Sequence, residues 1–277
     1  KLYVRARGGG NPGNYETEIS EFIYGGTNTI SLTGRRNRAQ DNDEADYITF
    51  ENLVIEGGYY PIEIETDYVE LKNSVFRKAY GDGVKVGGAL PNDFSNPDDP
   101  SQADYYNSEY GLIEGNDIHA FGESGTDITG GDYWIVKNNK IHDSVISKDN
   151  GTTNGIMLKN NNKGTIVEKN KIYDLVNGSA ITLGGASFGG IAREAEDLVV
   201  RNNIIYSLHG GQYGLAIMSC IDCAFYNNLI YGSSFTRELI IVSLSDTNHP
   251  EYTSVNAKIK NNIFYNNVVD WNGQHFY

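Results

Sequence analysis

The sequence predicts an all-β fold, a parallel β-solenoid whose coils are a little longer than about 20 residues. Three observations predict it: a segment that recurs along the chain, a short second strand after each copy of it, and a composition poor in helix formers. The chain has 277 residues, with 32 Gly and 20 Tyr but only 2 Met. Such a composition favours many short strands joined by turns.

The recurring segment is a run of alternating aliphatic residues, then Asn, then a pair that often ends on an aromatic residue or His. It is found at 47–58, 68–79, 110–121, 133–144, 164–175, 197–208, 223–234 and 257–268. The aligned asparagines are Asn52, Asn73, Asn116, Asn139, Asn170, Asn203, Asn228 and Asn262. Their spacing varies between 21 and 43 residues because insertions mostly follow one fixed point of the repeat.

The second strands of the repeat read PIEIET, GVKVGG, GTDITGG, GIMLKN, AITLGG, GLAIMS and LIIVSL. In a solenoid each coil packs its inward aliphatic residues on the next coil, so equivalent residues stack. We therefore predict an internal ladder of the asparagines, whose amides bond to the backbone of the neighbouring coil. Three residues later a second column is expected, made of Phe76, His119, His142, Tyr173, Tyr206, Tyr231 and Tyr265. We interpret His119 and His142 as members of this stack rather than as catalysts.

Through its recurring N-x-I-[HY] and G-[IV]-x-[VL] patterns, the segment 45–268 resembles the right-handed parallel β-helix proteins of the pectin-lyase-like superfamily. This resemblance implies a right-handed parallel β-helix of roughly eight to ten coils. We expect residues 1–46 to form irregular N-terminal coils and a polar loop, and 47–277 to form one continuous domain. The superfamily includes polysaccharide lyases, glycoside hydrolases, uronan epimerases, esterases and phage tailspikes, so the fold alone does not select an activity.

Charge and hydropathy exclude several classes of function. The formal net charge is -14 and no basic stripe is present, which argues against nucleic acid as a partner. The sequence contains no long apolar run, so it predicts no membrane-spanning helix. The chain begins KLYVRARGGG, and we expect a processed or trimmed secreted protein, extracellular or periplasmic, with further domains of a longer chain among its candidate partners. The two cysteines form CIDC; with no second pair to complete a zinc site, we interpret them as small residues on a strand and its turn.

Charged side chains gather on the outward face of the second strands. Aligning these strands on their inward residues places Lys85 between Glu63 and Asp127, with Glu65, Asp82 and Lys159 nearby, since coils are about 4.8 Å apart. Glycines flank this patch, and the insertion 90–110 follows it directly as a predicted wall. We predict a groove that binds a polysaccharide lying along the solenoid axis, with Asn154, Ser124 and Thr182 as further substrate-binding candidates.

The resemblance implies one chemistry for the groove, β-elimination from a uronic-acid polymer assisted by Ca²⁺, with Lys or Arg as the base. The candidate calcium ligands are Glu63, Glu65, Asp82 and Asp127. Lys85 or Lys159 is the candidate base, in a catalytic group that also includes Asp127. His142 and Arg193 are lesser candidates for the base and the carboxylate clamp. A bound cation would also reconcile an acidic protein with an acidic substrate.

Two other functions stay open on the sequence. A carboxylate pair, Glu63 with Glu65 or Asp82 with Asp127, could hydrolyse a glycosidic bond. A non-catalytic solenoid could bind glycans or act as an adhesin, with tyrosines stacked on sugars. Among the three, the charged column and the superfamily resemblance favour a secreted, calcium-assisted polysaccharide lyase.

Overall fold

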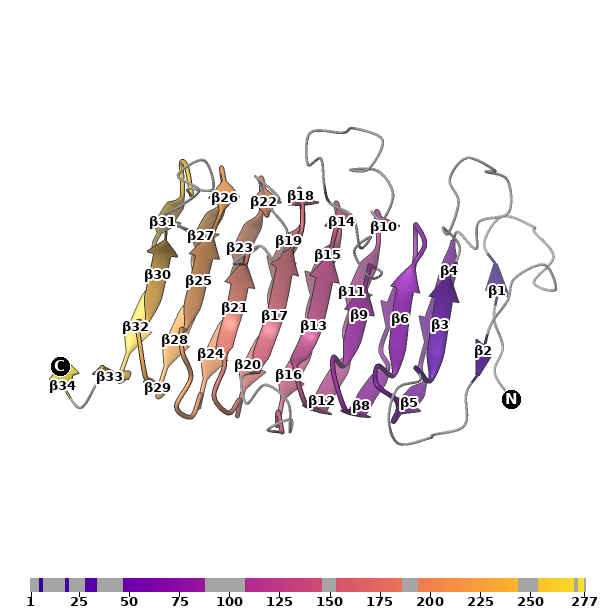
Figure 1. Ribbon diagram of the computed structural model, residues 1–277, viewed down its shortest axis with the longest axis horizontal. Helices are drawn as coiled ribbons and strands as arrows, with labels where there is room; N and C mark the ends of the chain where they lie inside the picture. The colour runs from indigo at the N-terminus through magenta and orange to yellow at the C-terminus, as the bar shows by residue number, and fades with distance from the viewer. Residues whose placement is uncertain are drawn as a thin grey trace, which may run out of the picture.

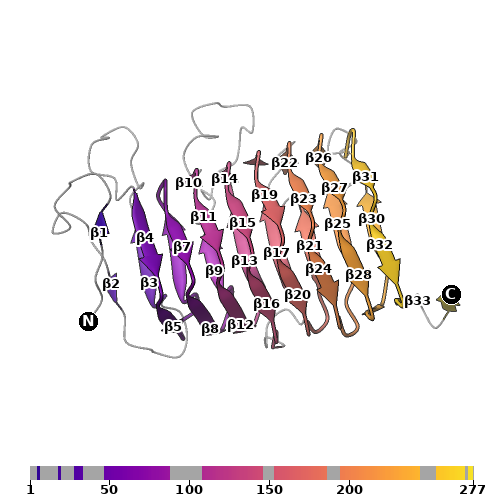
Figure 2. The same ribbon diagram turned by 180° about the vertical axis from the view of Figure 1, so that it is seen from behind.

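The structure is a computed structural model that describes residues 5–6, 18–19, 28–33, 47–87, 108–145, 153–185, 194–243, 254–271 and 274–276. Within these ranges every regular element is a β-strand. The strands stack into an elongated solenoid in which the chain advances coil by coil along the long axis (Figure 1). Seen from behind, the same order of coils is visible on the opposite face (Figure 2). The all-β solenoid predicted from the repeat is confirmed.

Three long sheets run along the solenoid, and each coil contributes one strand to each sheet in turn. The first sheet contains β1 (Arg5–Ala6), β4 (Ile48–Glu51), β7 (Glu70–Lys72), β11 (Leu112–Glu114), β15 (Ile135–Lys137), β19 (Ile166–Glu168), β23 (Val199–Arg201), β27 (Ala224–Tyr226) and β31 (Lys258–Lys260). The second contains β5 (Val54–Glu56), β8 (Val75–Ala79), β12 (Asp117–Phe121), β16 (Lys140–His142), β20 (Lys171–Tyr173), β24 (Ile204–Tyr206), β28 (Leu229–Tyr231) and β32 (Ile263–Tyr265).

The third sheet is the one that carries the predicted groove. It contains β2 (Glu18–Ile19), β3 (Ile30–Thr33), β6 (Ile62–Glu65), β9 (Val84–Val86), β13 (Ser124–Thr129), β17 (Asn154–Lys159), β21 (Ser179–Leu183), β25 (Leu215–Met218) and β30 (Ile240–Ser243). Short strands complete the coils: β10 (Ser108–Glu109) with β14 (Gly131–Asp132), β18 (Asn162–Lys163) with β22 (Ala195–Glu196) and β26 (Cys220–Ile221), and β29 (Ser234–Phe235) with β33 (Val268–Trp271) and β34 (Gln274–Phe276). Neighbouring coils pair in parallel; among the described strands only β1–β4, β2–β3 and β33–β34 are antiparallel.

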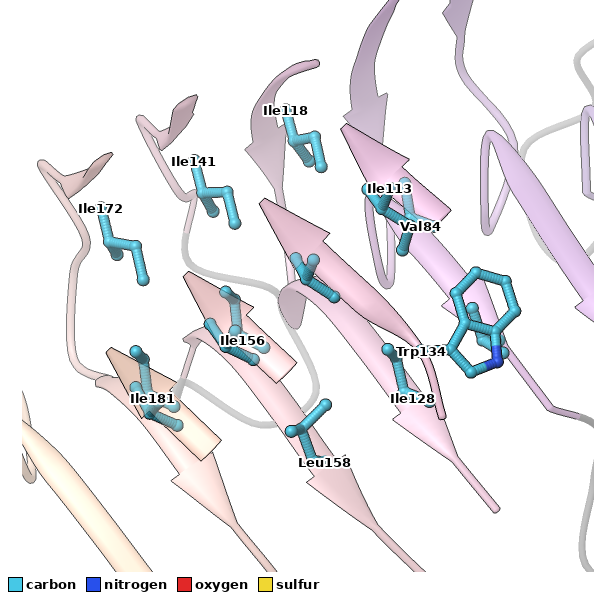
Figure 3. Packing of buried hydrophobic residues seen from close by; sticks show 14 of the residues in the cluster. Val84, Ile113, Ile118, Ile128, Trp134, Ile141, Ile156, Leu158, Ile172 and Ile181 are labelled. Carbon is cyan, nitrogen blue, oxygen red and sulfur yellow. The ribbon is translucent and has the colours of Figure 1, made fainter. Parts of the chain in front are cut away.

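The core is a set of aliphatic columns that run along the axis. Ile118, Ile141 and Ile172 stack in consecutive coils of the second sheet, and Ile156 and Ile181 do so in the third (Figure 3). All of them are fully buried. Each strand is only a few residues long, so burial of these columns between coils, rather than any single strand, stabilises the fold.

The asparagine ladder is present from Asn116 to Asn262. The side-chain oxygen of Asn139 accepts from the backbone N–H of Asn116 at 2.9 Å, and its amide donates to the Ile113 carbonyl at 2.9 Å. Asn170 repeats this pattern on Asn139 and Val136. Each amide thus satisfies a buried backbone N–H at the bend between the first and second sheets, where the backbone turns and cannot bond within a sheet.

In the first two coils the predicted alignment is wrong by one residue. Ser74, not Asn73, continues the ladder, because the Ser74 N–H donates to the Asn116 side chain and the Ser74 hydroxyl accepts from Leu53 N–H. Asn52 and Asn73 occupy the preceding position, where φ is 58° and 47°. Asparagine suits both positions of the bend, one for its left-handed backbone and one for its amide. Sequence letters alone did not separate the two.

The same shift corrects the start of the aromatic column. Phe76 pairs with Ile118 in the buried column, and Arg77 is the residue aligned with His119. From His119 to Tyr231 the prediction is confirmed, since His119, His142, Tyr173, Tyr206 and Tyr231 stack with ring centroids 4.6–5.2 Å apart. Tyr265 aligns with Tyr231 in the next coil. The two histidines are stack members on the outer face of the second sheet.

The two cysteines differ from their interpretation on the sequence. Cys220 and Cys223 form a disulfide, so the CIDC motif is a four-residue covalent loop rather than two unlinked small residues.

Most of segment 1–46 lies outside the described residues, and the domain boundary at 46 stays a prediction. In the described part of the chain, no helix is long and apolar enough to cross a bilayer.

Candidate functional site

The third sheet brings the predicted charged residues into one column. Lys85 pairs with Glu63 on one side and with Asp127 on the other, and Asp127 pairs with Met157 in the next coil. The inward neighbours Val84, Ile128 and Leu158 are buried, so the alternation of the strands turns the charged column outward. This register confirms the predicted alignment, including the coil in which Thr126 takes an inward position.

Asp127 is the centre of this column. Its carboxylate lies 2.9 Å from the Lys85 ammonium and 3.1 Å from the Lys159 ammonium. Lys85 also donates to the Thr129 hydroxyl at 2.8 Å and lies 3.9 Å from Asp82. The side chains of Lys85 and Asp127 are 11% and 6% exposed, whereas that of Lys159 is 29% exposed. Lys159 is therefore the lysine of this cluster that a bound molecule reaches most readily.

Burial and charge separate the acidities of the two aspartates. Burial, together with the Asp127 charge, raises the pKa of the Asp82 carboxyl to about 8. Burial also raises the pKa of Asp127, but Lys85 and Lys159 outweigh it and lower that pKa to about 2. Burial lowers the pKa of Lys85, and the charges of Asp127 and Asp82 outweigh it, so this pKa lies above its ordinary value. At neutral pH the cluster thus combines a protonated Asp82 and an ionised Asp127 with a cationic Lys85.

A group of tyrosines lies at the start of the same strands and was not predicted. The Tyr59 hydroxyl bonds to Glu123 at 3.1 Å, and the Tyr59 ring contacts the rings of Tyr60 and Tyr80 at 4.8 and 5.4 Å. Burial, then the Glu123 charge, raises the pKa of Tyr59 to about 12; burial and Asp82 raise that of Tyr60 further. Tyr59 and Tyr60 precede β6, and Tyr80 precedes β9 in the next coil, a signal that the alignment of the strands alone did not use.

A shallow pocket continues the same face over β17, β21 and β25. Its volume is ≈ 180 Å³, and it is lined by Asn154, Met157, Gly178, Ser179, Thr182, Gly185, Gln212, Tyr213 and Met218. Two predicted substrate-binding residues are among these, and the Thr182 hydroxyl donates to the Asn154 side chain at 3.3 Å. The third, Ser124, is buried, and its backbone N–H donates to Asp82 at 2.9 Å. Ser124 therefore supports Asp82 from behind the face instead of facing solvent.

Gly87 leaves the surface close to Lys85 without a side chain. Gly87 directly follows β9 and has a φ of +84°, and a Cβ placed there would lie 1.8 Å from the Thr129 carbonyl oxygen. No other residue fits such a close approach. The predicted floor residue Gly88, the insertion 90–107 and the candidate clamp Arg193 lie outside the described residues.

Two of the predicted calcium ligands, Asp127 and Glu63, bond to protein side chains in this arrangement. Two ammonium groups bond to the Asp127 carboxylate, and Glu63 accepts from Asn28 and Ser31. In the described part of the chain, the group of three metal-binding side chains with ligand atoms within 4.8 Å of one another lies on the second sheet instead. Calcium binding by this chain stays a prediction.

His142, the lesser candidate for the base, is separated from the lysine cluster by the fold. It lies on β16 of the second sheet, whereas Lys85 and Lys159 lie on the third. Its ring is stacked between His119 and Tyr173. The structure thus brings together Lys85, Lys159, Asp127 and Asp82 and places His142 in another neighbourhood.

Residues 102–269 match the family model described as the right handed beta helix region. The chain belongs to this family. The match covers more than half of the chain and agrees with the parallel three-sheet solenoid of the structure. No curated protein sequence matches this β-helix.

Several solved structures share the fold. The A-module of the Azotobacter vinelandii mannuronan C-5 epimerase AlgE6 is 19% identical with a TM-score of 0.50, over 76% of this chain and 51% of that one. An alginate lyase from Paenibacillus sp. str. FPU-7 is 12% identical with a TM-score of 0.51, over 77% and 78% of the two chains. PfbA, a surface adhesin of Streptococcus pneumoniae, is 12% identical with a TM-score of 0.48, over 89% and 70%. This β-helix spans about half the length of the epimerase module. At these identities the likeness shows the fold alone.

Proposed function

We propose that this β-helix is a polysaccharide lyase that binds a uronic-acid polymer along the third sheet. The observation that carries the proposal is the pair of lysines that converge on Asp127 beside an open pocket. The ammonium groups of Lys85 and Lys159, 2.9 and 3.1 Å from Asp127, are two cations on the outward face of the third sheet. A uronate carboxylate is attracted to such cations.

The proposed reaction is β-elimination. A base removes the C5 proton of the uronate, the electron pair forms the C4–C5 double bond, and the C4–O bond breaks with a proton passing to the leaving oxygen. Lys85 suits the role of a fixed cation beside the substrate carboxylate, since its surroundings favour the charged form. Lys159 is more exposed and shares Asp127 with Lys85. We therefore assign to Lys159 the direct contact with the reacting sugar and the proton transfer.

The substrate and the location are part of the same proposal. Two structural neighbours are a mannuronan epimerase and an alginate lyase, and mannuronan and alginate are uronic-acid polymers, so alginate is the first substrate to test. The Cys220–Cys223 disulfide supports an oxidising compartment, and we propose a secreted or periplasmic protein.

The test is the formation of unsaturated uronate, followed by ultraviolet absorbance on alginate, pectate and glycosaminoglycans, with calcium and with a chelator. We expect activity on one uronan and a loss of about 100-fold or more in kcat/KM for Lys159→Met. Lys137→Met is the matched control, because Lys137 is also paired to a carboxylate, Glu114 at 3.2 Å, but lies on the first sheet. Absence of unsaturated product on every uronan, or full activity of Lys159→Met, would overturn the assignment.

Glycoside hydrolysis is the second candidate, favoured by one observation. Asp82 and Asp127 have pKa values pushed in opposite directions, which is the usual property of an acid and base pair. Both are buried, so a sugar would contact them only after the lysines move. New reducing ends without unsaturated product, lost in Asp127→Asn, would select this function; binding without either product would select a glycan-binding solenoid.

A further inference from the structure

The outer face of the second sheet carries a cluster that the lyase proposal does not use. Asp117 on β12, His119 two residues later and His142 on the neighbouring β16 present ligand atoms that all lie within 4.8 Å of one another. The Asp117 oxygen Oδ1 lies 2.7 Å from His119 Nδ1 and 3.0 Å from His142 Nε2. Two imidazole nitrogens thus converge on one carboxylate oxygen.

We propose that Asp117, His119 and His142 bind a divalent transition-metal ion of the zinc class. Imidazole and carboxylate are ligands that suit Zn²⁺, Co²⁺ and Ni²⁺, whereas Ca²⁺ prefers oxygen ligands alone. In a tetrahedral zinc site, bonds of about 2.0–2.1 Å place neighbouring ligand atoms about 3.4 Å apart. The observed 2.7 and 3.0 Å require these distances to lengthen by about 0.7 and 0.4 Å when an ion binds.

The neighbours of the cluster hold the two rings in position. His119 and His142 stack with centroids 5.1 Å apart and an interplanar angle of 18°, and Tyr173 supports His142 from the other side at 4.6 Å. Both rings are held on strands of a rigid sheet, which keeps ligand atoms in place before binding.

A fourth side chain provides an independent observation that points to a metal. His142 binds Asp117 through Nε2, and its other nitrogen, Nδ1, lies 2.9 Å from the Asp143 carboxylate. Histidines that bind metals commonly donate their second nitrogen to a carboxylate in this way, which orients the ring. The one guanidinium aligned with the site, Arg77, bonds instead to Glu56 at 2.7 Å.

The three protein ligands leave a fourth position open to water or a small ligand. The side chains of Asp117, His119 and His142 are 37%, 24% and 13% exposed, so an ion can enter from solvent. Because the ligands come from β12 and β16, the ion would join two consecutive coils by coordinate bonds.

The test is zinc binding by the untagged protein, measured by calorimetry, with Co²⁺ absorption as a report of coordination. We expect one zinc per chain and a higher melting temperature when zinc is present. The double variant His119→Tyr/His142→Tyr removes two ligands but keeps an aromatic column, since Tyr173 and Tyr206 already occupy equivalent positions. It should lose stoichiometric binding and the zinc-dependent rise in melting temperature.

Two further variants separate a metal site from incidental binding. Asp143→Asn should weaken zinc binding about 10–100-fold while leaving all three ligands in place. His209→Gln is the matched control, because His209 also faces an aspartate, Asp174, at 3.6 Å but has no second histidine in the described structure around it. Zinc binding that survives in the double variant, or no binding by the wild-type protein, would overturn the proposal.

Discussion

Replacing Asp82 by Asn should remove a large part of the pH dependence of stability. Asp82 is 1% exposed, and burial with the Asp127 charge raises its pKa from 3.8 to about 8. A carboxyl with a raised folded-state pKa contributes its full stability below the unfolded pKa and loses it as pH rises through the folded value. The window for Asp82 therefore runs from about pH 4 to about pH 8.

The magnitude follows from the size of this rise. One pKa unit corresponds to about 1.4 kcal/mol, so the change from 3.8 to about 8 links an amount of order 5 kcal/mol to pH. Asn is a neutral isostere whose side-chain oxygen can still accept from Ser124 N–H. We expect Asp82→Asn to unfold with a free energy close to that of the wild type near pH ~4, and to exceed it by about 2–5 kcal/mol near pH ~9.

The assay is denaturant unfolding of both proteins across this pH range. Asp222→Asn is the matched control, because Asn256 already occupies the equivalent position of the next coil with φ 57°, against 56° for Asp222. The control should follow the wild type at every pH. Parallel curves for Asp82→Asn and the wild type would refute the argument that Asp82 is held protonated.

Two further predictions concern the scaffold. Asn170→Ala should lower the free energy of unfolding by about 2–4 kcal/mol, because Asn139 N–H loses its acceptor and the Val136 carbonyl loses a donor. Lys171→Ala, on the exposed face of the adjacent strand, should change this free energy little. Equal losses in the two variants would contradict the role of the ladder. Reducing the Cys220–Cys223 disulfide should lower stability by about 2 kcal/mol, as expected for a closed loop of four residues, measured as a shift of the denaturant midpoint. A double Cys→Ser variant that still responds to reductant would contradict that origin.

The sequence predicted the elements that repeat and missed those that do not. Equivalent residues in eight segments defined the inward columns and the place of Lys85 between Glu63 and Asp127, because a period of two and a stacked register determine both. The ladder shifted by one residue at Ser74, since Asn is favoured at both adjacent positions of the bend. Copies from several coils were needed to tell the two positions apart, and the first two coils lack the second asparagine.

The alignment of the strands did not predict the ion pairs within the candidate site. The alignment placed Asp82, Asp127 and two lysines near one another, but it treated the carboxylates as free to bind calcium. In the structure, the side chains of Lys85 and Lys159 both turn to Asp127. The pairing of His142 with Asp117 was likewise hidden, since residues of two coils meet there only after the chain has closed a full turn.

The asparagine ladder has a consequence for how such a chain can change over generations. Successive ladder residues bond in the same geometry although 23, 31, 33, 25 and 34 residues separate them. A coil can therefore gain or lose up to 11 residues, the difference between 34 and 23, without disturbing the register of its neighbours. Insertions and deletions, which disrupt most folds, become an ordinary source of variation here. New loops can arise beside the third sheet while the stacked scaffold is inherited unchanged.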